Sequence, residues 1–333
     1  MLLELTHQTV FEYSEPVSVS YLEFRQTPLT DSSQHLLQHR QRVVPQRPVR
    51  QYVDALGNTV SHLNVLERQT RIEVAFDSLV QTYPTRYRGK PIPPPERAGP
   101  AARMALHDFL QPTELTRPCE RLFEFARPLE PLRRAPVEAA VEEIRAAIHT
   151  GFRYEPALTT ASSPIQEFLE HGGGVCQDYA HLMLTVCRHL GFAARYVSGY
   201  VLPDPGEEDA PQASHAWCEV FDPDRGWLGV DPTHNAWVEE RYVRLGVGRD
   251  FRDVPPNRGV FRGGGTETLH VFVRLRPVNQ EALSERSRAE YLPERPVAPS
   301  GPSGGSRKAP TLTLLQQAQI MHQQQQQQQQ TSK

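Results

Sequence analysis

Hydrophobic and polar residues alternate along roughly the first 82 residues with the two-residue period of β-strands. The alternation runs from Leu3 to Tyr13, again from Val17 to Phe24, and once more from Arg71 to Phe76. Helical periodicity is absent from this region, and Gly57-Asn58 is typical of a hairpin turn. We therefore predict a mostly antiparallel β domain, arranged as a small sandwich.

The apolar pattern changes to the helical period after residue 135. One apolar face over about 136–149 predicts an amphipathic helix that begins at Pro136. A short helix is expected for the segment IQEFLEH, and a long one from Cys176 to about Leu190, with Gly191 after its last turn. Strand patterns follow at 194–201, 214–221, 227–231 and in the segment LHVFVRLRP.

These patterns predict an α+β protein in four parts. Residues 1–82 form the β domain, and residues 83–134 form a proline-rich connection with two short helical candidates, 101–110 and 118–127. Residues 135–276 form an α+β domain, in which the helix that starts at Cys176 packs on an antiparallel sheet. Residues 277–333 lose the composition of a core and end in a glutamine tract, which predicts a disordered low-complexity tail.

Composition narrows the classes of partner. The net charge of -3 over 333 residues gives no reason to expect nucleic acid or an acidic membrane surface as a partner.

The N-terminus lacks the pattern of a signal peptide, and no run reaches the roughly 18 apolar residues of a membrane span, so a cytoplasmic location is expected. The four cysteines have scattered spacings that indicate neither a disulfide framework nor a CxxC zinc site. We expect no cofactor and no metal, and the oligomeric state stays open.

The chemistry suggested by the sequence centres on Cys176. Three glycines, Gly172 to Gly174, precede it, and the long helix begins at the cysteine itself. A helix N-terminus has a positive dipole end and free N–H groups, which favour a thiolate over a thiol and can bind an oxyanion. We therefore interpret Cys176 as a nucleophile, whereas Cys187 and Cys218 are expected in the core.

Two later residues supply the partners that a nucleophilic thiol needs. His215 lies at the mouth of a strand near Trp217, whose ring would shield an ion pair from water. Asp231 ends the next strand, and pairing about the turn 222–226 brings it close to His215. We expect its carboxylate to hold Nδ1–H of the imidazole, which leaves Nε2 facing the thiol. Glu219 is the alternative for this third position.

Other residues are candidates for supporting roles. The backbone N–H of Cys176 is the expected first oxyanion donor, and Tyr154 is a candidate for the second. Asp178 is expected to cap the helix or to support the nucleophile. His234 lies near the predicted site and is assigned no role.

Several motifs resemble those of a known family. The segments GGGVCQDYAHL, RYVSGY, ASHAWCEVF and GWLGVDPTHN are similar to the transglutaminase-like superfamily of papain-type thiol enzymes, in its bacterial branch. The segments LTHQTVFEYSEPVSVSYLEFRQTP and DALGNTV resemble the β domain that precedes the enzyme domain in these proteins. The resemblance covers roughly residues 1–276 and carries the family's nucleophile, base and orienting carboxylate onto Cys176, His215 and Asp231.

The residues and the resemblance together predict a cysteine-dependent enzyme that transfers an acyl group from a protein or peptide amide through a thioester. Water or an amine can resolve that thioester, so a protease or amidohydrolase and a transglutaminase are both open. An alternative from another class is a non-catalytic protein-interaction module with a vestigial triad. A zinc site of Cys176, His215 and Cys218 is disfavoured, because positions 215 and 218 are an odd number apart in one strand and face opposite sides.

Overall fold

The N-terminal part of the chain folds into strands, as the alternation predicts. The computed structural model describes residues 1–84, 104, 106–206, 212–263 and 265–279. Six strands run through the first 82 residues: β1 (Leu2–Val17), β2 (Val19–Phe24), β3 (Gln34–Val44), β4 (Val49–Val53), β5 (Thr59–Val65) and β6 (Gln69–Thr82). Alternate apolar side chains turn inward and form one core, which includes Phe11, Phe24, Leu63, Ile72 and Phe76.

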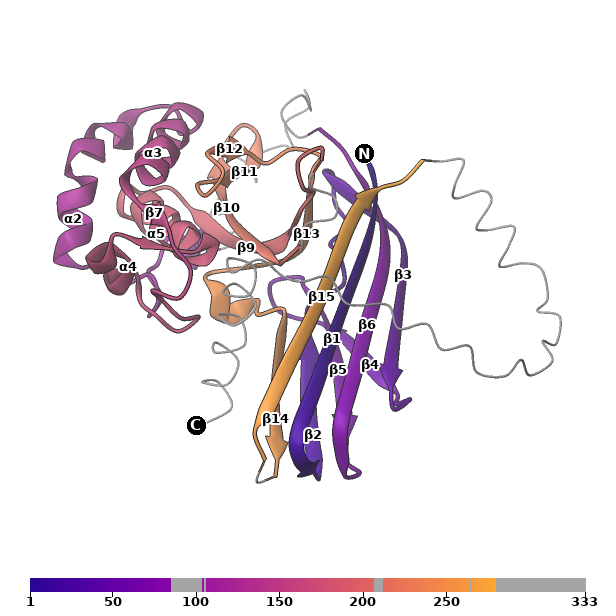
Figure 1. The fold of residues 1–333 in the computed structure, drawn as a ribbon. Helices are drawn as coiled ribbons and strands as arrows, with labels where there is room; N and C mark the ends of the chain where they lie inside the picture. Colours follow the sequence, from indigo (N-terminus) through magenta and orange to yellow (C-terminus); the bar gives the residue numbers. More distant parts are fainter. Residues whose placement is uncertain (85–103, 105, 207–211, 264, 280–333) are drawn as a thin grey trace.

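Two strands from much later in the chain complete this sandwich. β14 (Asn257–Arg262) pairs with β2, and β15 (Glu267–Pro277) pairs with β1 along almost its whole length. The resulting sheets have the orders β15-β1-β6-β3 and β14-β2-β5-β4, both antiparallel (Figure 1). The prediction that residues 135–276 are one enzyme domain is therefore wrong for its last two strands. Their alternation marks them as strands, but strand pairing between distant segments is not visible in a local pattern.

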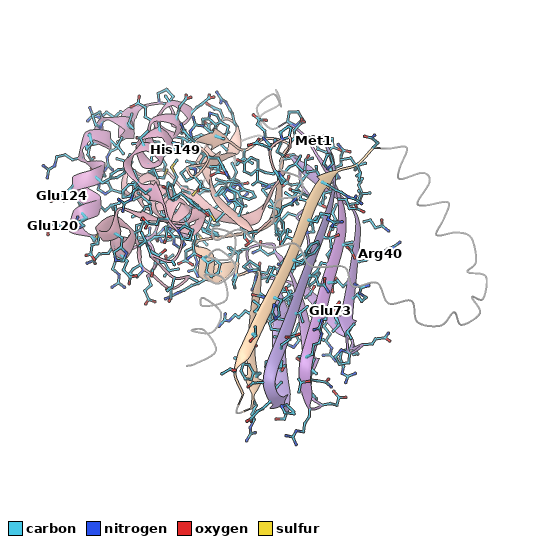
Figure 2. The ribbon with its side chains drawn as sticks, in the orientation of Figure 1. Met1, Arg40, Glu73, Glu120, Glu124 and His149 are labelled. Carbon is cyan, nitrogen blue, oxygen red and sulfur yellow. The ribbon has the colours of Figure 1, made fainter. Side chains whose placement is uncertain are left out.

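The helices gather on the other side of the molecule. They are α2 (Glu120–Ala126), the 3₁₀ helix η2 (Arg127–Arg134), α3 (Val137–Gly151), α4 (Ile165–His171) and α5 (Cys176–His189). Glu120 and Glu124 point to solvent from α2 (Figure 2), whereas Leu122 on its other face is fully buried. Leu122 shares one hydrophobic core with α3 and α5, so this part of the predicted connection belongs to the helical layer. The helical candidate at 101–110 lies partly, and the tail from residue 280 wholly, outside the described residues.

The helices cover one face of a five-stranded antiparallel sheet. Its order is β12 (Ala236–Trp237), β11 (Gly226–Asp231), β10 (His215–Asp222), β9 (Ala194–Val201) and β13 (Tyr242–Gly248). α5 is buried on nearly every side because helices pack around it and the sheet lies beneath it. Gly191, with a φ of 91°, follows the helix in the left-handed region, as expected of a residue that ends a helix. Smaller elements are the parallel pair β7 (Arg153–Tyr154) and β8 (Gly173–Gly174), and the short helix η3 (Phe251–Asp253).

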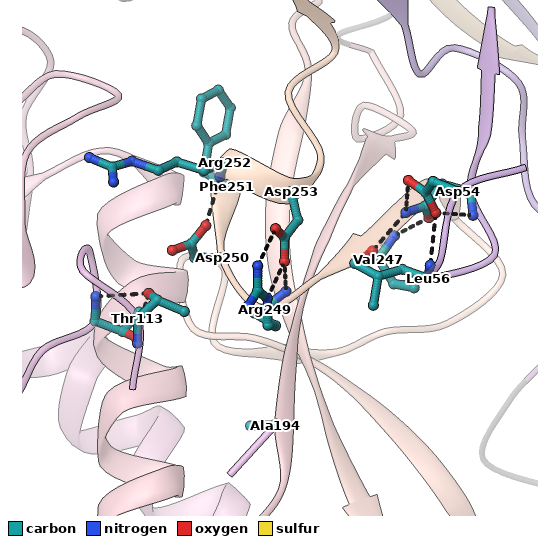
Figure 3. A network of polar contacts seen from close by, with 12 residues as sticks. Asp54, Leu56, Thr113, Ala194, Val247, Arg249, Asp250, Phe251, Arg252 and Asp253 are labelled. Atoms are coloured by element: carbon teal, nitrogen blue, oxygen red, sulfur yellow. Dashed lines mark hydrogen bonds and ion pairs between the residues drawn. The ribbon is translucent and has the colours of Figure 1, made fainter. Parts of the chain in front are cut away.

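The sandwich and the sheet share a core rather than meeting through a linker. Side chains of β1 and β15 pack against those of β9 and β13, among them Leu3, Leu5, Tyr200, Val243 and Leu275. The predicted turn at Gly57-Asn58 contributes to this interface. The side-chain amide of Asn58 donates to the Val247 carbonyl at 2.9 Å, and its oxygen accepts from the Val247 N–H at 2.7 Å. The same amide nitrogen also donates to the carboxylate of Asp54, which lies beside Val247 (Figure 3). Asn58 thus pairs with β13 as a strand backbone would.

A buried arginine adds a second link across the interface. Arg244 on β13 forms an ion pair with Glu219 at 2.7 Å, and its guanidinium also contacts Asp31 and Ser33 of the sandwich. Burial lowers the pKa of Arg244 to about 10.

Among the described residues, no helix combines the length and the apolar character needed to cross a membrane.

Candidate active site

The glycine-rich turn places the thiol of Cys176 at the first residue of α5. Gly172 ends α4 with a φ of 68°, a left-handed conformation that favours glycine. A side chain at Gly174 would collide with the carboxylate of Asp178 and with the ring of Phe168. Both glycines therefore let the chain turn directly from one helix into the next. Cys176 is left half-buried at the helix N-terminus, where backbone N–H groups point away from the helix.

Asp178 holds this helix start in place. Its Oδ2 accepts from the Val175 N–H at 2.8 Å and from the Thr159 hydroxyl at 2.6 Å. Burial raises the pKa of Asp178 to about 6, although these two hydrogen bonds oppose the change. The expected cap is present, and it also ties the segment before α4 to the residue next to the cysteine.

His215 and Asp231 form a buried ion pair on neighbouring strands. His215 Nε2 lies 2.7 Å from Asp231 Oδ2, and the exposed fractions of the two residues are 9% and 0%. The predicted proximity is confirmed, but the predicted nitrogen is wrong, because Nε2 and not Nδ1 faces the carboxylate. Nδ1 is therefore the nitrogen left for the thiol. Which nitrogen faces Asp231 depends on the rotation of the ring, which strand pairing does not specify.

The charges of the pair are strongly coupled to each other. Burial alone would lower the pKa of His215, but the charge and hydrogen bond of Asp231, followed by those of Cys176, raise it to about 10. Burial likewise opposes ionisation of Asp231, yet His215 and then His234 bring the pKa of that carboxyl well below its usual value. These shifts favour an imidazolium beside a carboxylate at neutral pH, and the sulfur of Cys176 interacts with the His215 ring.

Asp231 has more partners than the sequence indicates. Its Oδ2 also faces His234 Nδ1 at 2.7 Å and accepts from the Tyr242 hydroxyl at 3.0 Å. Its Oδ1 accepts from the backbone N–H groups of Thr233 and His234. The short spacing in Asp-Pro-Thr-His could have indicated the contact with His234. Tyr242 could not have been found this way, because it comes from β13 on the opposite edge of the sheet.

Trp217 shields the pair, as predicted. It is fully buried, and its ring stacks on that of His215 with centroids 6.0 Å apart and planes 27° apart. Gly199 lies opposite His215 on β9, and a side chain there would strike the Val243 carbonyl and the Trp217 ring. The glycine therefore leaves the space in which Trp217 covers the histidine.

The structure separates Glu219 from the site. Both of its carboxylate oxygens bind arginines: Arg195 at 2.6 Å and Arg244 at 2.7 Å. Glu219 is therefore a member of the interface network, and Asp231 occupies the position beside the histidine. Cys218 donates to the Ala180 carbonyl at 3.1 Å in the core beneath α5, away from His215.

Two tyrosines lie near the nucleophile. Tyr154, the predicted second oxyanion donor, is part of β7 and pairs with Gly174 just before the cysteine. It is 39% exposed, and its role as a donor stays a prediction. Tyr196 was not predicted. It is buried, and burial followed by the charge of Cys176 raises its pKa well above the usual value.

Comparison with known proteins assigns the family. Residues 125–232 match the family model of the transglutaminase-like superfamily, and residues 3–81 match that of the bacterial transglutaminase-like N-terminal region. An uncharacterized protein of Mycobacterium tuberculosis is 33% identical over 298 residues, which cover 84% of this chain and 94% of that protein. One from Mycobacterium leprae is 31% identical over 280 residues, covering 82% and 98%.

More distant matches agree with this assignment. A protein-glutamine gamma-glutamyltransferase of Pseudomonas aeruginosa is 34% identical over 117 residues, which cover 30% of this chain and 17% of that enzyme. The crystal structure of a Cytophaga hutchinsonii protein shares the fold, with a TM-score of 0.62 at 21% identity over 84% of this chain and 92% of that one. The two family models match parts of both the sandwich and the helix-covered sheet. With the relatives that are similar over most of its length, they show that this chain belongs to the transglutaminase-like superfamily.

Proposed function

We propose that this protein is a cysteine-dependent enzyme that transfers the acyl group of a protein or peptide amide. The observation that supports this most is the ion pair of His215 and Asp231, which interacts with a thiol at a helix N-terminus. A cysteine beside an imidazolium in a shielded site is the arrangement that activates a thiol nucleophile.

The first half of the reaction forms a thioester. The Cys176 thiolate attacks the carbonyl carbon of the amide, and a C–S bond forms while the oxygen becomes an oxyanion. The backbone N–H of Cys176, at the positive end of α5, stabilises that oxyanion. The C–N bond then breaks, and His215 gives its Nδ1 proton to the leaving amine. Asp231 holds Nε2–H throughout and keeps the ring aimed at the sulfur.

The second half releases the acyl group. Water or a primary amine attacks the thioester carbonyl, His215 accepts the proton of the attacking group, and the thiolate leaves. Hydrolysis and amine transfer differ only in this acceptor. The same catalytic residues serve both, so the acceptor is decided by which molecule reaches the thioester.

Alkylation by iodoacetamide tests the nucleophile. Burial raises the pKa of Cys187 to about 12 and that of Cys218 well above its usual value, so both should react slowly at neutral pH. We expect Cys176 to be labelled first, with the site located by mass spectrometry. His215→Ala should remove this advantage, whereas His270→Ala, which changes an exposed histidine on β15 of the sandwich, should not.

The proposal fails if the cysteines react at similar rates, or if His215→Ala leaves the rate at Cys176 unchanged. Either result would favour a protein-interaction module in which the three residues have no catalytic role. A second assay separates the two acceptors. A library of glutamine-containing peptides is incubated with and without a primary amine, and mass spectrometry distinguishes cleaved, deamidated and amine-linked products.

A further inference from the structure

Three side chains that can bind a metal converge at the outer end of the active site. The nearest ligand atoms of His215, Asp231 and His234 all lie within 4.8 Å of one another. The two imidazole rings are adjacent, with centroids 4.7 Å apart, and both direct a nitrogen at the same carboxylate oxygen. Hydrolysis or transfer requires only one of these histidines.

We propose that His215, Asp231 and His234 form a binding site for a divalent transition metal such as Zn²⁺, and that the bound ion reversibly inactivates the enzyme. This departs from the prediction that the chain has no metal ligands. The metal-binding part stands on the geometry of the three residues alone. The inhibition rests on the proposed function.

The donor set indicates the class of metal. Two imidazole nitrogens and one carboxylate oxygen suit zinc and its neighbours, whereas calcium and magnesium prefer oxygen ligands. Three protein ligands leave one position of a tetrahedral zinc ion for water. Neither Cys187 nor Cys218 is part of this group, because both lie in the core.

The distances allow an ion after a small movement. Tetrahedral zinc with bonds of about 2.0–2.1 Å keeps its ligand atoms roughly 3.3 Å apart. His215 and His234 each lie 2.7 Å from Asp231 Oδ2, so both contacts must open by roughly 0.6 Å. The side chain of His234 is 51% exposed and follows the end of β11, so it can move outward and gives the ion a path from solvent.

The carboxylate is already held in the orientation that a ligand needs. Tyr242 donates to Oδ2, and the backbone N–H groups of Thr233 and His234 donate to Oδ1. Metal-binding carboxylates are commonly fixed by such outer hydrogen bonds, which raise the affinity of the site. None of these three donors has to leave when an ion binds between the histidines.

A metal ion on His215 Nε2 would stop the proposed reaction. The ion replaces the proton at Nε2, so the ring keeps a single N–H, at Nδ1. Transfer of that proton to the leaving amine would produce an imidazolate, which is far less favourable than a neutral imidazole. The thiolate can therefore attack, but the amine cannot leave with its proton.

Cobalt titration tests the site without any need for turnover. Co²⁺ is added to full-length Cys176→Ala protein, and its visible d–d absorption is followed. We expect binding to persist without the thiol and to weaken at least about tenfold in Cys176→Ala/His234→Asn. The control Cys176→Ala/His270→Asn, with an exposed histidine far from the site, should bind like Cys176→Ala. Loss of binding in Cys176→Ala, or equal affinity in the His234→Asn variant, would overturn the proposal.

Inhibition is measured separately on protein with the native cysteine. The rate with Zn²⁺ is divided by the rate with EDTA for each variant, so differences in basal activity cancel. Zn²⁺ should suppress turnover, EDTA should restore it, and His234→Asn should need at least about tenfold more Zn²⁺. Full turnover with the metal bound would refute the inhibition, and absence of any turnover would refute the proposed function while leaving the cobalt result valid.

Discussion

Replacing Asp231 by asparagine should abolish the ion pair while keeping the side-chain volume. In the native protein, Asp231 is fully buried and accepts from His215, His234 and Tyr242. The asparagine side chain of Asp231→Asn could still accept a hydrogen bond from His215 but carries no charge. Burial would then act on His215 without opposition from a carboxylate, and its imidazole should be neutral at pH 7.

The size of the effect follows from the pKa of His215. A rise from 6.5 to about 10 corresponds to roughly 5 kcal/mol in favour of the imidazolium. Asp231 supplies the largest favourable part and Cys176 the smaller part. Loss of the orienting carboxylate in a comparable triad lowers turnover by about 10⁴. We expect a loss of about 10³ to 10⁴ in Asp231→Asn.

Stability should change with pH in a defined direction. His215 binds its proton more tightly in the folded protein than in the unfolded chain, so the stabilisation is fully present below pH 6.5 and is lost as the pH rises toward about 10. Thermal denaturation followed by circular dichroism should show a steeper decline across this range in the wild type than in Asp231→Asn. Alkylation of Cys176 is measured at the same pH values.

The matched control is Asp224→Asn, which removes the charge of an exposed aspartate in the turn between β10 and β11. It should follow the wild type in stability, turnover and alkylation. Parallel pH curves for the wild type and Asp231→Asn, together with equal alkylation rates, would refute the reasoning, because His215 would then be charged for another reason.

Three further substitutions test the interface and the shielding of the site. Asn58→Ala leaves the N–H and C=O of Val247 without their partner. The free energy of unfolding measured in urea should therefore fall by about 2–4 kcal/mol. An unchanged value would contradict a stabilising role for the Asn58–Val247 hydrogen bonds. Burial lowers the pKa of His7 to about 3, so the stability linked to its neutral ring is present above pH 6.5 and is lost as the pH falls toward 3. His7→Gln should therefore make the free energy of unfolding less dependent on pH between 6.5 and 3. An equally steep fall in the variant would show that His7 contributes nothing. Gly199→Ala should displace the Trp217 ring, lowering stability by about 1–3 kcal/mol and turnover with it, and native tryptophan fluorescence with native activity would exclude that displacement.

Local patterns in the sequence were sufficient to locate the elements that carry the site. The glycine turn and the apolar period placed the start of a helix at Cys176, and α5 begins there. A short turn after residue 222 made β10 and β11 neighbours, which brought His215 and Asp231 together. These features depend on backbone conformation over a few residues, so the residues themselves specify them.

Only the tertiary structure decided how the site is completed. Tyr242 reaches Asp231 from the far edge strand, and β14 and β15 return to the sandwich after the whole helix-covered sheet has intervened in the sequence. The ring orientation of His215 is set by its surroundings. Each of these depends on side chains and strands that meet only after packing. Periodicity in the sequence tells which residues turn inward, but it does not tell which residues they meet.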